Sequence, residues 1–269
     1  MSVVAKALAL LNHFSVECPE IGLSDLCRAA KRDKATTYRH LTALQDLGFV
    51  EQNPRTKSYR IGPAVLHLAD LREATVPRRS GALAPLQTLA DAIGETAHVS
   101  VLSGHTLHAL AFCESNLHST RAVIDLQTLP LHATASGLCV LAFGPPELMP
   151  VATAGLAAFT SHTAATEEQL QVLVDAAATQ GFAISDRGLE ADIHGLAVPV
   201  FDHTGQVAGS VAVASVSSRI TPARIQETKH QLVKASQDIT HNWGGRVPPK
   251  VQALWDATLT SDSKKALTS

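Results

Sequence analysis

The segment with the clearest chemical potential covers residues 34–47, KATTYRHLTALQDL. Three of its residues recur at the spacing of one helix face: Thr37, Leu41 and Leu44. The side chains on its other faces can donate hydrogen bonds or carry positive charge: Lys34, Thr36, Tyr38 and Arg39. A short helix packed on one side and carrying such groups on the other suits the major groove of DNA. Arg39 is the best candidate for reading a base, because a guanidinium can bond bidentately to guanine.

Two predicted helices precede this segment and position it. The first covers residues 2–14. The second is short, with Ser24 as its predicted N-cap, and ends at Ala30. After a basic turn, Asp33 is the predicted N-cap of the third helix, and Gly48 ends that helix. Three short helices in this order are typical of a helix-turn-helix.

A basic hairpin follows the third helix. Residues 49–52 and 58–61 predict two strands, joined by a turn that begins with Asn53-Pro54. Phosphate contacts position a protein on DNA without specifying its sequence. Three cations of the turn and second strand are predicted to make them: Arg55, Lys57 and Arg60. Residues 1–62 therefore predict a winged helix-turn-helix DNA-binding domain.

Charge and composition agree with a DNA-binding head. Residues 1–62 hold nine Lys and Arg against six Asp and Glu, whereas the remainder holds thirteen against eighteen. A basic head on an acidic body is typical when only the head contacts nucleic acid. No apolar run reaches the roughly 18–20 residues of a membrane helix, so no membrane partner is expected. The four cysteines form no C-x-x-C pair, which favours a reducing cytoplasm over a disulfide-bonded secreted protein.

The rest of the chain predicts a linker helix over residues 63–76, a second domain over 77–243 and a tail over 244–269. The second domain alternates helices with strands, which indicates an α+β fold. Its predicted strands cover residues 97–102, 107–112, 121–125, 195–201 and 207–216. Its predicted helices cover residues 82–93, 132–143, 166–180 and 222–242. The tail is expected to be partly disordered, with a short helix near residues 251–259.

The order of these motifs resembles that of the IclR family, bacterial regulators named after the isocitrate lyase regulator. Four parts of the chain carry the resemblance: residues 23–26 with 34–41, residues 48–50 with 59–62, residues 130–137, and residues 197–202. It implies that the winged helix-turn-helix is joined by the linker helix to a GAF-like α/β effector-binding domain. It also implies a homodimer or a dimer of dimers on a double-stranded DNA operator.

The resemblance also implies a site for a small-molecule effector. Small-acid sensors of the family bind a carboxylate with backbone amides at a helix start and with polar side chains on three strands. The matching positions here are Ala135, Ser136, Ser185, Ile193, Gly195, Ala212 and Ala214. Where such sensors place a cysteine and two serines, this chain has Gly195, Ala212 and Ala214. We therefore expect a roomier, less polar site and a mid-sized or aromatic carboxylate rather than a glyoxylate-like or pyruvate-like acid. Ser185, with Asp186, is predicted to lie on a loop.

Signals for other chemistry are weak. His98, His105 and His108 lack the i, i+4 pairing with a carboxylate that marks a metal site, so neither a metal nor a cofactor is predicted. No G-x-S-x-G or G-x-G-x-x-G motif is present, which predicts no catalytic residues and no enzyme. The favoured interpretation is a ligand-responsive, sequence-specific regulator of a catabolic operon. One alternative is a regulator whose second domain serves only oligomerisation, with a collapsed apolar core around Ala212 and Ala214. Another is an enzyme with an appended DNA-binding head, which would need a cluster of titratable residues where the sequence offers only scattered candidates.

Overall fold

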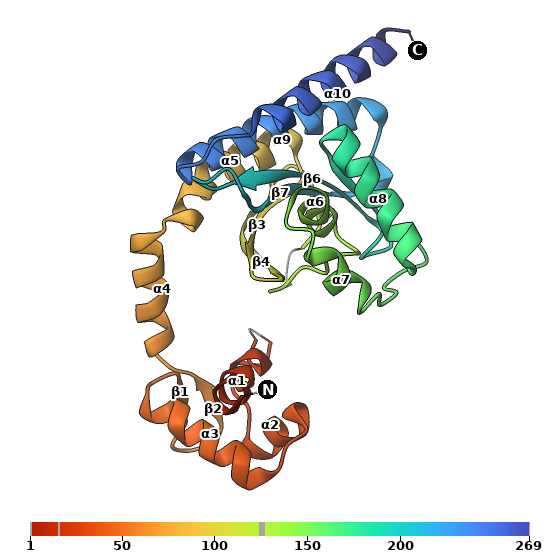
Figure 1. The fold of residues 1–269 in the computed structure, drawn as a ribbon. Coiled ribbons are helices and arrows are strands. Elements are labelled where there is room, and N and C mark those ends of the chain that lie inside the picture. Colours follow the sequence, from red (N-terminus) through yellow and green to blue (C-terminus); the bar gives the residue numbers. More distant parts are fainter. Residues whose placement is uncertain (1, 16, 124–126, 269) are drawn as a thin grey trace. The chain divides into compact units, whose positions relative to one another are not determined.

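The computed structural model describes residues 2–15, 17–123 and 127–268 (Figure 1). Residues 263–268 are described by their backbone alone. The chain divides into two compact units after Val76. Among the described residues, no helix has both the length and the apolar character that crossing a membrane requires.

The first unit contains four α-helices, a 3-10 turn and a two-stranded antiparallel wing. The helices are α1 (Val3–Leu8), α2 (Leu23–Ala30), α3 (Lys34–Asp46) and α4 (Ala64–Thr75), with the 3-10 segment η1 (Ala9–His13) after α1, and the wing strands are β1 (Val50–Gln52) and β2 (Tyr59–Ile61). The predicted first helix is thus an α-helix that tightens into a 3-10 turn. A fully or nearly buried cluster joins η1, α2, α3 and the wing: Leu10, Phe14, Ile21, Leu26, Leu41, Leu44, Val50 and Tyr59.

The start of α2 differs from the prediction. Gly22, not Ser24, is the N-cap, and its carbonyl accepts hydrogen bonds from the amides of Asp25 and Leu26. Ile21 exchanges two backbone hydrogen bonds with Tyr59 of the wing. This bridge holds the chain extended up to Gly22, so the helix begins directly after it.

The second unit is a five-stranded antiparallel sheet with helices on both faces. The strand order is β4-β3-β7-β6-β5. The strands are β3 (Thr96–Ser103), β4 (Thr106–Cys113), β5 (Ala183–Asp186), β6 (Ile193–Phe201) and β7 (Val207–Val216). The helices are α5 (Arg78–Ile93), α6 (Ala135–Phe143), α7 (Leu148–Thr153), α8 (Glu167–Gln180), α9 (Pro222–Asn242) and α10 (Pro249–Thr268), with the 3-10 turn η2 (Ser217–Arg219) after β7.

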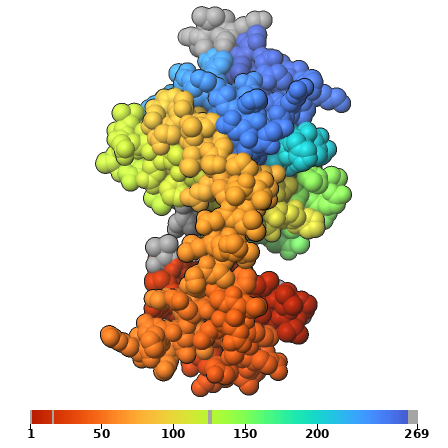
Figure 2. All heavy atoms as spheres, turned by 90° about the vertical axis from the view of Figure 1, so that its left-hand side faces the viewer, coloured from red at the N-terminus to blue at the C-terminus, as the bar shows by residue number. Residues whose placement is uncertain are grey.

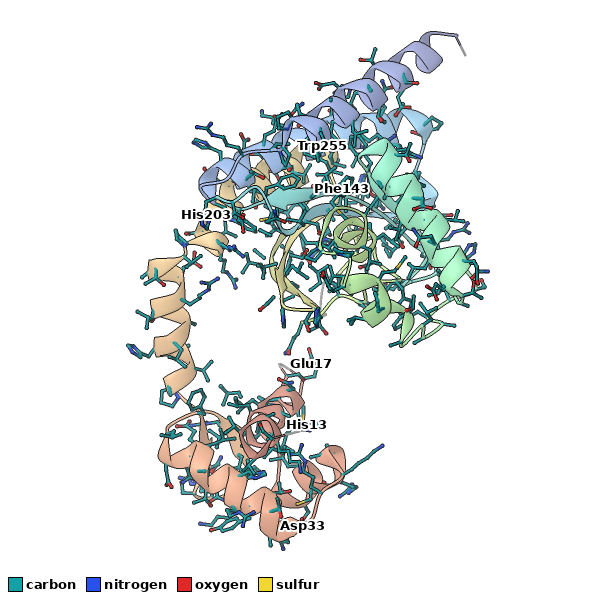
Figure 3. All side chains as sticks on the ribbon, viewed as in Figure 1. His13, Glu17, Asp33, Phe143, His203 and Trp255 are labelled. Carbon is teal, nitrogen blue, oxygen red and sulfur yellow. The ribbon has the colours of Figure 1, made fainter. Side chains whose placement is uncertain are left out.

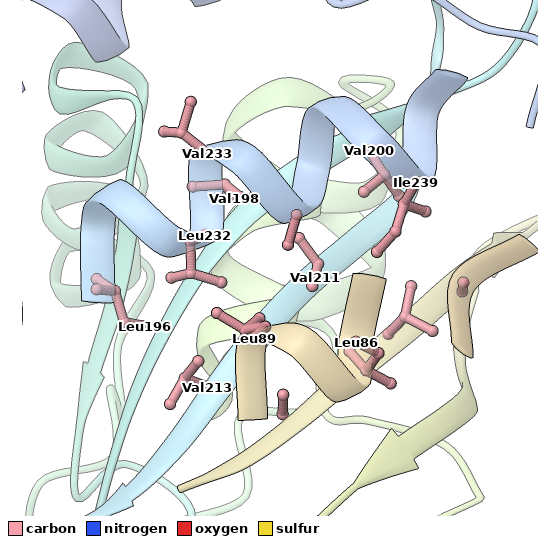
Figure 4. Close-up of a cluster of buried hydrophobic side chains, with 14 of the residues drawn as sticks. Leu86, Leu89, Leu196, Val198, Val200, Val211, Val213, Leu232, Val233 and Ile239 are labelled. Atoms are coloured by element: carbon pink, nitrogen blue, oxygen red, sulfur yellow. The ribbon is translucent and has the colours of Figure 1, made fainter. Parts of the chain in front are cut away.

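Alternation along the strands gives each face its own core. On one face, Leu86 and Leu89 of α5 and Leu232 and Ile239 of α9 converge on strand residues such as Val211 (Figure 4). In Figure 2, the atoms of α5 and of the C-terminal helices form one continuous surface on this side. On the other face, α6, α7 and α8 pack over small residues of the sheet. This second face holds the cavity described below.

Three predictions about the second unit need correction. Residues 121–123 have no regular structure, and residues 124 and 125 of the predicted strand lie outside the described residues. The helix predicted from residue 132 begins at Ala135, because Thr134 has an extended backbone and caps the helix through its hydroxyl. Ser185 and Asp186 lie on strand β5 rather than on a loop, and Ser185 pairs with Gly195 of β6.

The helix of the tail is longer than predicted. Residues Pro249–Thr268 form one helix, α10, where the sequence predicts a short helix near residues 251–259. Trp255, marked on α10 in Figure 3, is completely buried, and its indole Nε1 donates a hydrogen bond of 2.7 Å to the carbonyl of Gly181. A buried aromatic side chain with its polar atom satisfied is a strong anchor, so the helix is held against its own unit.

Candidate functional site

Helix α3 has a buried inner face formed by the predicted residues. Thr37 and Leu41 are fully buried, and His40 and Leu44 are at most 5% exposed. Asp33, marked in Figure 3, is the N-cap, because its carboxylate accepts a hydrogen bond of 2.8 Å from the amide of Thr36. That hydrogen bond lowers the pKa of Asp33, which keeps the cap charged at neutral pH.

The other faces of α3 leave most of the predicted groups available. Lys34, Tyr38 and Arg39 are exposed, and Thr36 is half-buried. Neither Lys34 nor Arg39 forms a side-chain ion pair with any residue that the structure describes. Burial and the nearby arginine cations lower the pKa of His40, so this inward-facing ring is neutral at pH 7. The exposed part of the helix is therefore cationic and able to donate hydrogen bonds.

The wing presents two of its three cations freely. Arg55 and Lys57 are exposed in the turn, where the side chain of Asn53 accepts hydrogen bonds from the amides of Arg55 and Thr56. Arg60 instead pairs with Glu51 at 2.5 Å and reaches Glu20 at 3.5 Å. Since its charge is already partly neutralised, Arg60 is a weaker candidate for a phosphate contact than Arg55 or Lys57.

The second unit contains a cavity between α6 and the sheet. Its empty volume is about 610 Å³, which includes the space open to solvent at its mouth. All seven residues that the sequence predicts for an effector line it: Ala135, Ser136, Ser185, Ile193, Gly195, Ala212 and Ala214. Sequence positions up to 79 residues apart thus meet in one place.

The register of the strands explains the floor of the cavity. Ser185 pairs with Gly195, which in turn pairs with Ala214, so these three lie in one row across β5, β6 and β7. In the next row on the same face, Ala212 of β7 pairs with His98 of β3. Helix α6 comes so close to the sheet that a Cβ added to Gly195 would lie 3.0 Å from that of Ala135. Only small residues fit at this position. The short side chains of Gly195, Ala212 and Ala214 leave the space above the sheet open.

The start of α6 forms a polar wall. The amide of Gly137 is bonded to the hydroxyl of Thr134, and that of Leu138 to the carbonyl of Thr134. The preceding amides, of Ala135 and Ser136, have no intrahelical acceptor because they lie in the first turn. Amides at a helix start favour an anion. Ser185 contributes less than predicted, because its hydroxyl already donates a hydrogen bond of 2.7 Å to the carbonyl of Ala133.

Sequence reasoning missed several lining residues. The most informative is His98, whose Nε2 lies 3.1 Å from Oγ of Ser136. Burial lowers the pKa of His98 to about 4, so the ring is neutral at pH 7. The other missed residues are Ala122, Val123, Leu129, Ala133, Thr134, Leu189 and Glu190. Alternation along the predicted strand 97–102 puts the side chain of His98 on the other face of the sheet from Ala97 and Val99. Only the register between β3 and β7 brings it beside Ala212.

Histidines do not combine into a metal site in the part of the chain that the structure describes. No three His, Cys, Asp or Glu side chains there gather closely enough to hold an ion. Of the histidines considered above, His98 lies in the cavity, His105 is exposed in the turn after β3, and His108 lies on β4.

Two family models match this chain. The model of the IclR helix-turn-helix domain matches residues 3–54, and that of the bacterial transcriptional regulator IclR C-terminal domain matches residues 67–241. The chain is 26% identical over 243 residues to the HTH-type transcriptional regulator XynR of Escherichia coli K12, covering 90% of this chain and 96% of XynR. It is also 26% identical over 251 residues to the Pca regulon regulatory protein of Pseudomonas putida, covering 91% and 85% of the two chains.

Solved structures agree with these matches. An IclR transcriptional regulator from Silicibacter sp. TM1040 is 40% identical, with a TM-score of 0.85 over 93% of this chain and 99% of its own. An IclR homologue from Microbacterium hydrocarbonoxydans, solved in complex with 4-hydroxybenzoate, shares the fold with a TM-score of 0.73 at 22% identity, over 89% and 100% of the two chains. The matched relatives are transcriptional regulators and not enzymes. This chain therefore belongs to the IclR family of DNA-binding bacterial transcriptional regulators.

Proposed function

We propose that this regulator responds to a mid-sized or aromatic carboxylate that binds in the cavity of its second unit. The observation that carries the proposal is the floor of Gly195, Ala212 and Ala214 beneath the start of α6. An assembly-only domain would be expected to fill this space with apolar side chains. An open cavity beside two helix-start amides argues for a ligand instead.

The chemistry of the walls indicates which class of ligand fits. Most lining residues are apolar, among them Val123, Leu129 and Leu189, and they suit a ring or a short hydrocarbon chain. The amides of Ala135 and Ser136 suit a carboxylate. A two- or three-carbon acid would leave much of the apolar surface uncovered. The complex of the Microbacterium hydrocarbonoxydans homologue with 4-hydroxybenzoate supports an aromatic acid for this fold.

A thermal-shift and calorimetric screen tests the ligand class. The full chain would be titrated with glyoxylate, pyruvate, benzoate and 4-hydroxybenzoate. We expect stabilisation by the aromatic acids and none by the small ones. Gly195→Ser and Ala212→Ser return hydroxyl groups to the floor and should weaken the aromatic acids, whereas Ala109→Ser on β4, outside the cavity, should not. Stabilisation by glyoxylate or pyruvate alone would refute the proposal.

For DNA, we propose that α3 enters the major groove, with Arg39 reading a base and Thr36 and Tyr38 contacting the operator beside it. Lys34, Arg55 and Lys57 would contact phosphates, and Arg60 less so because of its pairing with Glu51. Two copies in a homodimer, or a dimer of dimers, would place two such helices in successive major grooves of a near-palindrome. An operon for the breakdown of the effector is the proposed target.

Operator selection followed by anisotropy titrations tests this interface. Arg39→Ala should cost about 1–3 kcal/mol on the selected operator and relax specificity at one position. Arg55→Ala should weaken all sequences about equally and lower the salt slope by about 1. Arg246→Ala, at an exposed site in the second unit, is the matched control. Unchanged specificity in Arg39→Ala would refute base reading by that residue, and sedimentation would give the oligomeric state.

A further inference from the structure

His98 combines three properties that the proposed function does not use. It lies on β3, lines the cavity and is only 7% exposed. Its Nε2 shares a hydrogen bond with the hydroxyl of Ser136, at the start of α6. Its Nδ1 is buried and has no partner within the described part of the chain. A buried polar atom without a partner is costly and needs an explanation.

The surroundings of His98 contain almost no charge. Across the sheet, β4 places Phe112 and β7 places Ala212 opposite it. On α6 its neighbour is Ser136, and the buried Cys139 lies one turn further along. Among the described lining residues, Glu190 is the only other ionisable side chain, and it is exposed. The described residues around His98 therefore keep its ring neutral, because none of them compensates a buried positive charge.

A carboxylate at the start of α6 would supply that compensation. It would lie beside the amides of Ala135 and Ser136, and Ser136 is already bonded to the imidazole. An opposite charge within about 4–6 Å of a buried imidazole favours its protonated form. With that proton, Nε2–H would donate to the Ser136 hydroxyl and Nδ1–H would donate to an oxygen of the bound carboxylate, which would give Nδ1 the partner it lacks.

We propose that His98 is a ligand-binding residue and that the carboxylate effector enters the cavity together with one proton, which is taken up from solvent and resides on His98. The step balances: a proton from solvent forms an N–H bond on His98 as the anion binds, no bond to carbon changes, and the proton returns to solvent when the anion dissociates. This inference deepens the proposed function and rests on it. It makes the regulator more sensitive to its effector as the surrounding pH falls.

Calorimetry on the full chain tests proton uptake directly. Benzoate and 4-hydroxybenzoate would be titrated at pH 6.0 in two buffers with different heats of ionisation, which gives the number of protons bound per ligand. We expect uptake approaching one proton and an affinity that falls by up to about tenfold per pH unit between pH 5.5 and 7.5. His98→Gln should abolish both effects and weaken binding, while His105→Gln, at an exposed position on the neighbouring turn, should retain them.

The outcomes separate the two proposals. Binding of either probe with uptake that disappears in His98→Gln supports the inference. Binding without uptake, or uptake that persists in a folded His98→Gln variant, overturns the inference and leaves the carboxylate site standing. Failure of all four acids of the screen to bind at any pH overturns both. If His98→Gln does not fold, the proton count of the unmodified chain still decides, because zero uptake at pH 6.0 contradicts the proposal.

Discussion

Replacing Trp255 by alanine should strongly destabilise the second unit. The indole is completely buried, and it donates a hydrogen bond of 2.7 Å to the carbonyl of Gly181. Truncating a buried tryptophan costs about 3–5 kcal/mol, because apolar contacts are lost and a cavity remains. The Gly181 carbonyl would also lose its donor. For a unit the size of Pro77–Ser269, 1 kcal/mol corresponds to about 2–4 °C, so Tm should fall by about 6–20 °C.

Two companion variants divide this loss into its parts. Trp255→Phe keeps most of the ring and removes the N–H, so it should cost about 1–3 kcal/mol. Gly181→Ala should also destabilise the second unit, because it crowds the Trp255 ring. Gly181 has a φ of +82°, and an added Cβ would lie 2.7 Å from Cδ1 of Trp255. Ser261→Ala, at an exposed position on α10, is the matched control and should leave Tm almost unchanged.

The assay is thermal and urea denaturation of the full chain, followed by circular dichroism and by tryptophan fluorescence. Since the loss of Trp255 changes the fluorescence itself, circular dichroism gives the Tm that is compared. A decrease of less than about 2 °C in Trp255→Ala would show that α10 is not anchored to the unit through this side chain. The tail would then behave as the sequence analysis expects.

Three further predictions concern the remaining buried groups. Because the pKa of His98 is about 4 in the folded protein and about 6.5 when unfolded, the unfolded state binds the extra proton between these values. The ligand-free protein should therefore lose up to about 3 kcal/mol of stability as pH falls from 6.5 to 4, and His98→Gln should remove that part of the pH profile. Arg219→Ala should lower the free energy of unfolding by about 3–5 kcal/mol in urea titrations, because Glu95 is 3% exposed and would keep a buried charge without its bidentate partner. An equal loss in Arg219→Lys would show that the bidentate geometry matters. Gly62→Ala should destabilise the wing and weaken DNA binding, since a Cβ there would lie 2.2 Å from the carbonyl oxygen of Gly48; unchanged melting of the first unit would contradict the close approach.

The sequence by itself determined helix α3. Its signals are local: Asp33 sits where an N-cap is needed, and the buried positions Thr37, Leu41 and Leu44 recur with the period of one helix face. A helix start and a helix period depend on residues three or four positions apart, so both can be read along the chain. The long strands β6 and β7 follow in the same way from apolar runs on either side of a turn.

Other features depended on contacts between distant segments. Gly22 replaces Ser24 as the N-cap of α2 because Ile21 pairs with the wing, 38 residues further along the chain. Helix α10 is ordered because Trp255 finds the carbonyl of Gly181. Neither partner is visible from the local sequence, and intrinsic preference is a weak guide where such contacts decide.

The cavity is the clearest example of what the sequence predicts and what only the tertiary structure decides. Seven of its lining residues could be named from the motifs that this chain shares with its family, and the structure brings these seven together. His98 could not be named, although it is a neutral imidazole and the only histidine among the described lining residues. Its position depends on the register that places it opposite Ala212, and its partner Ser136 comes from a helix 38 residues away. Local patterns determine which elements form, but only tertiary packing decides which polar group remains buried beside an open space.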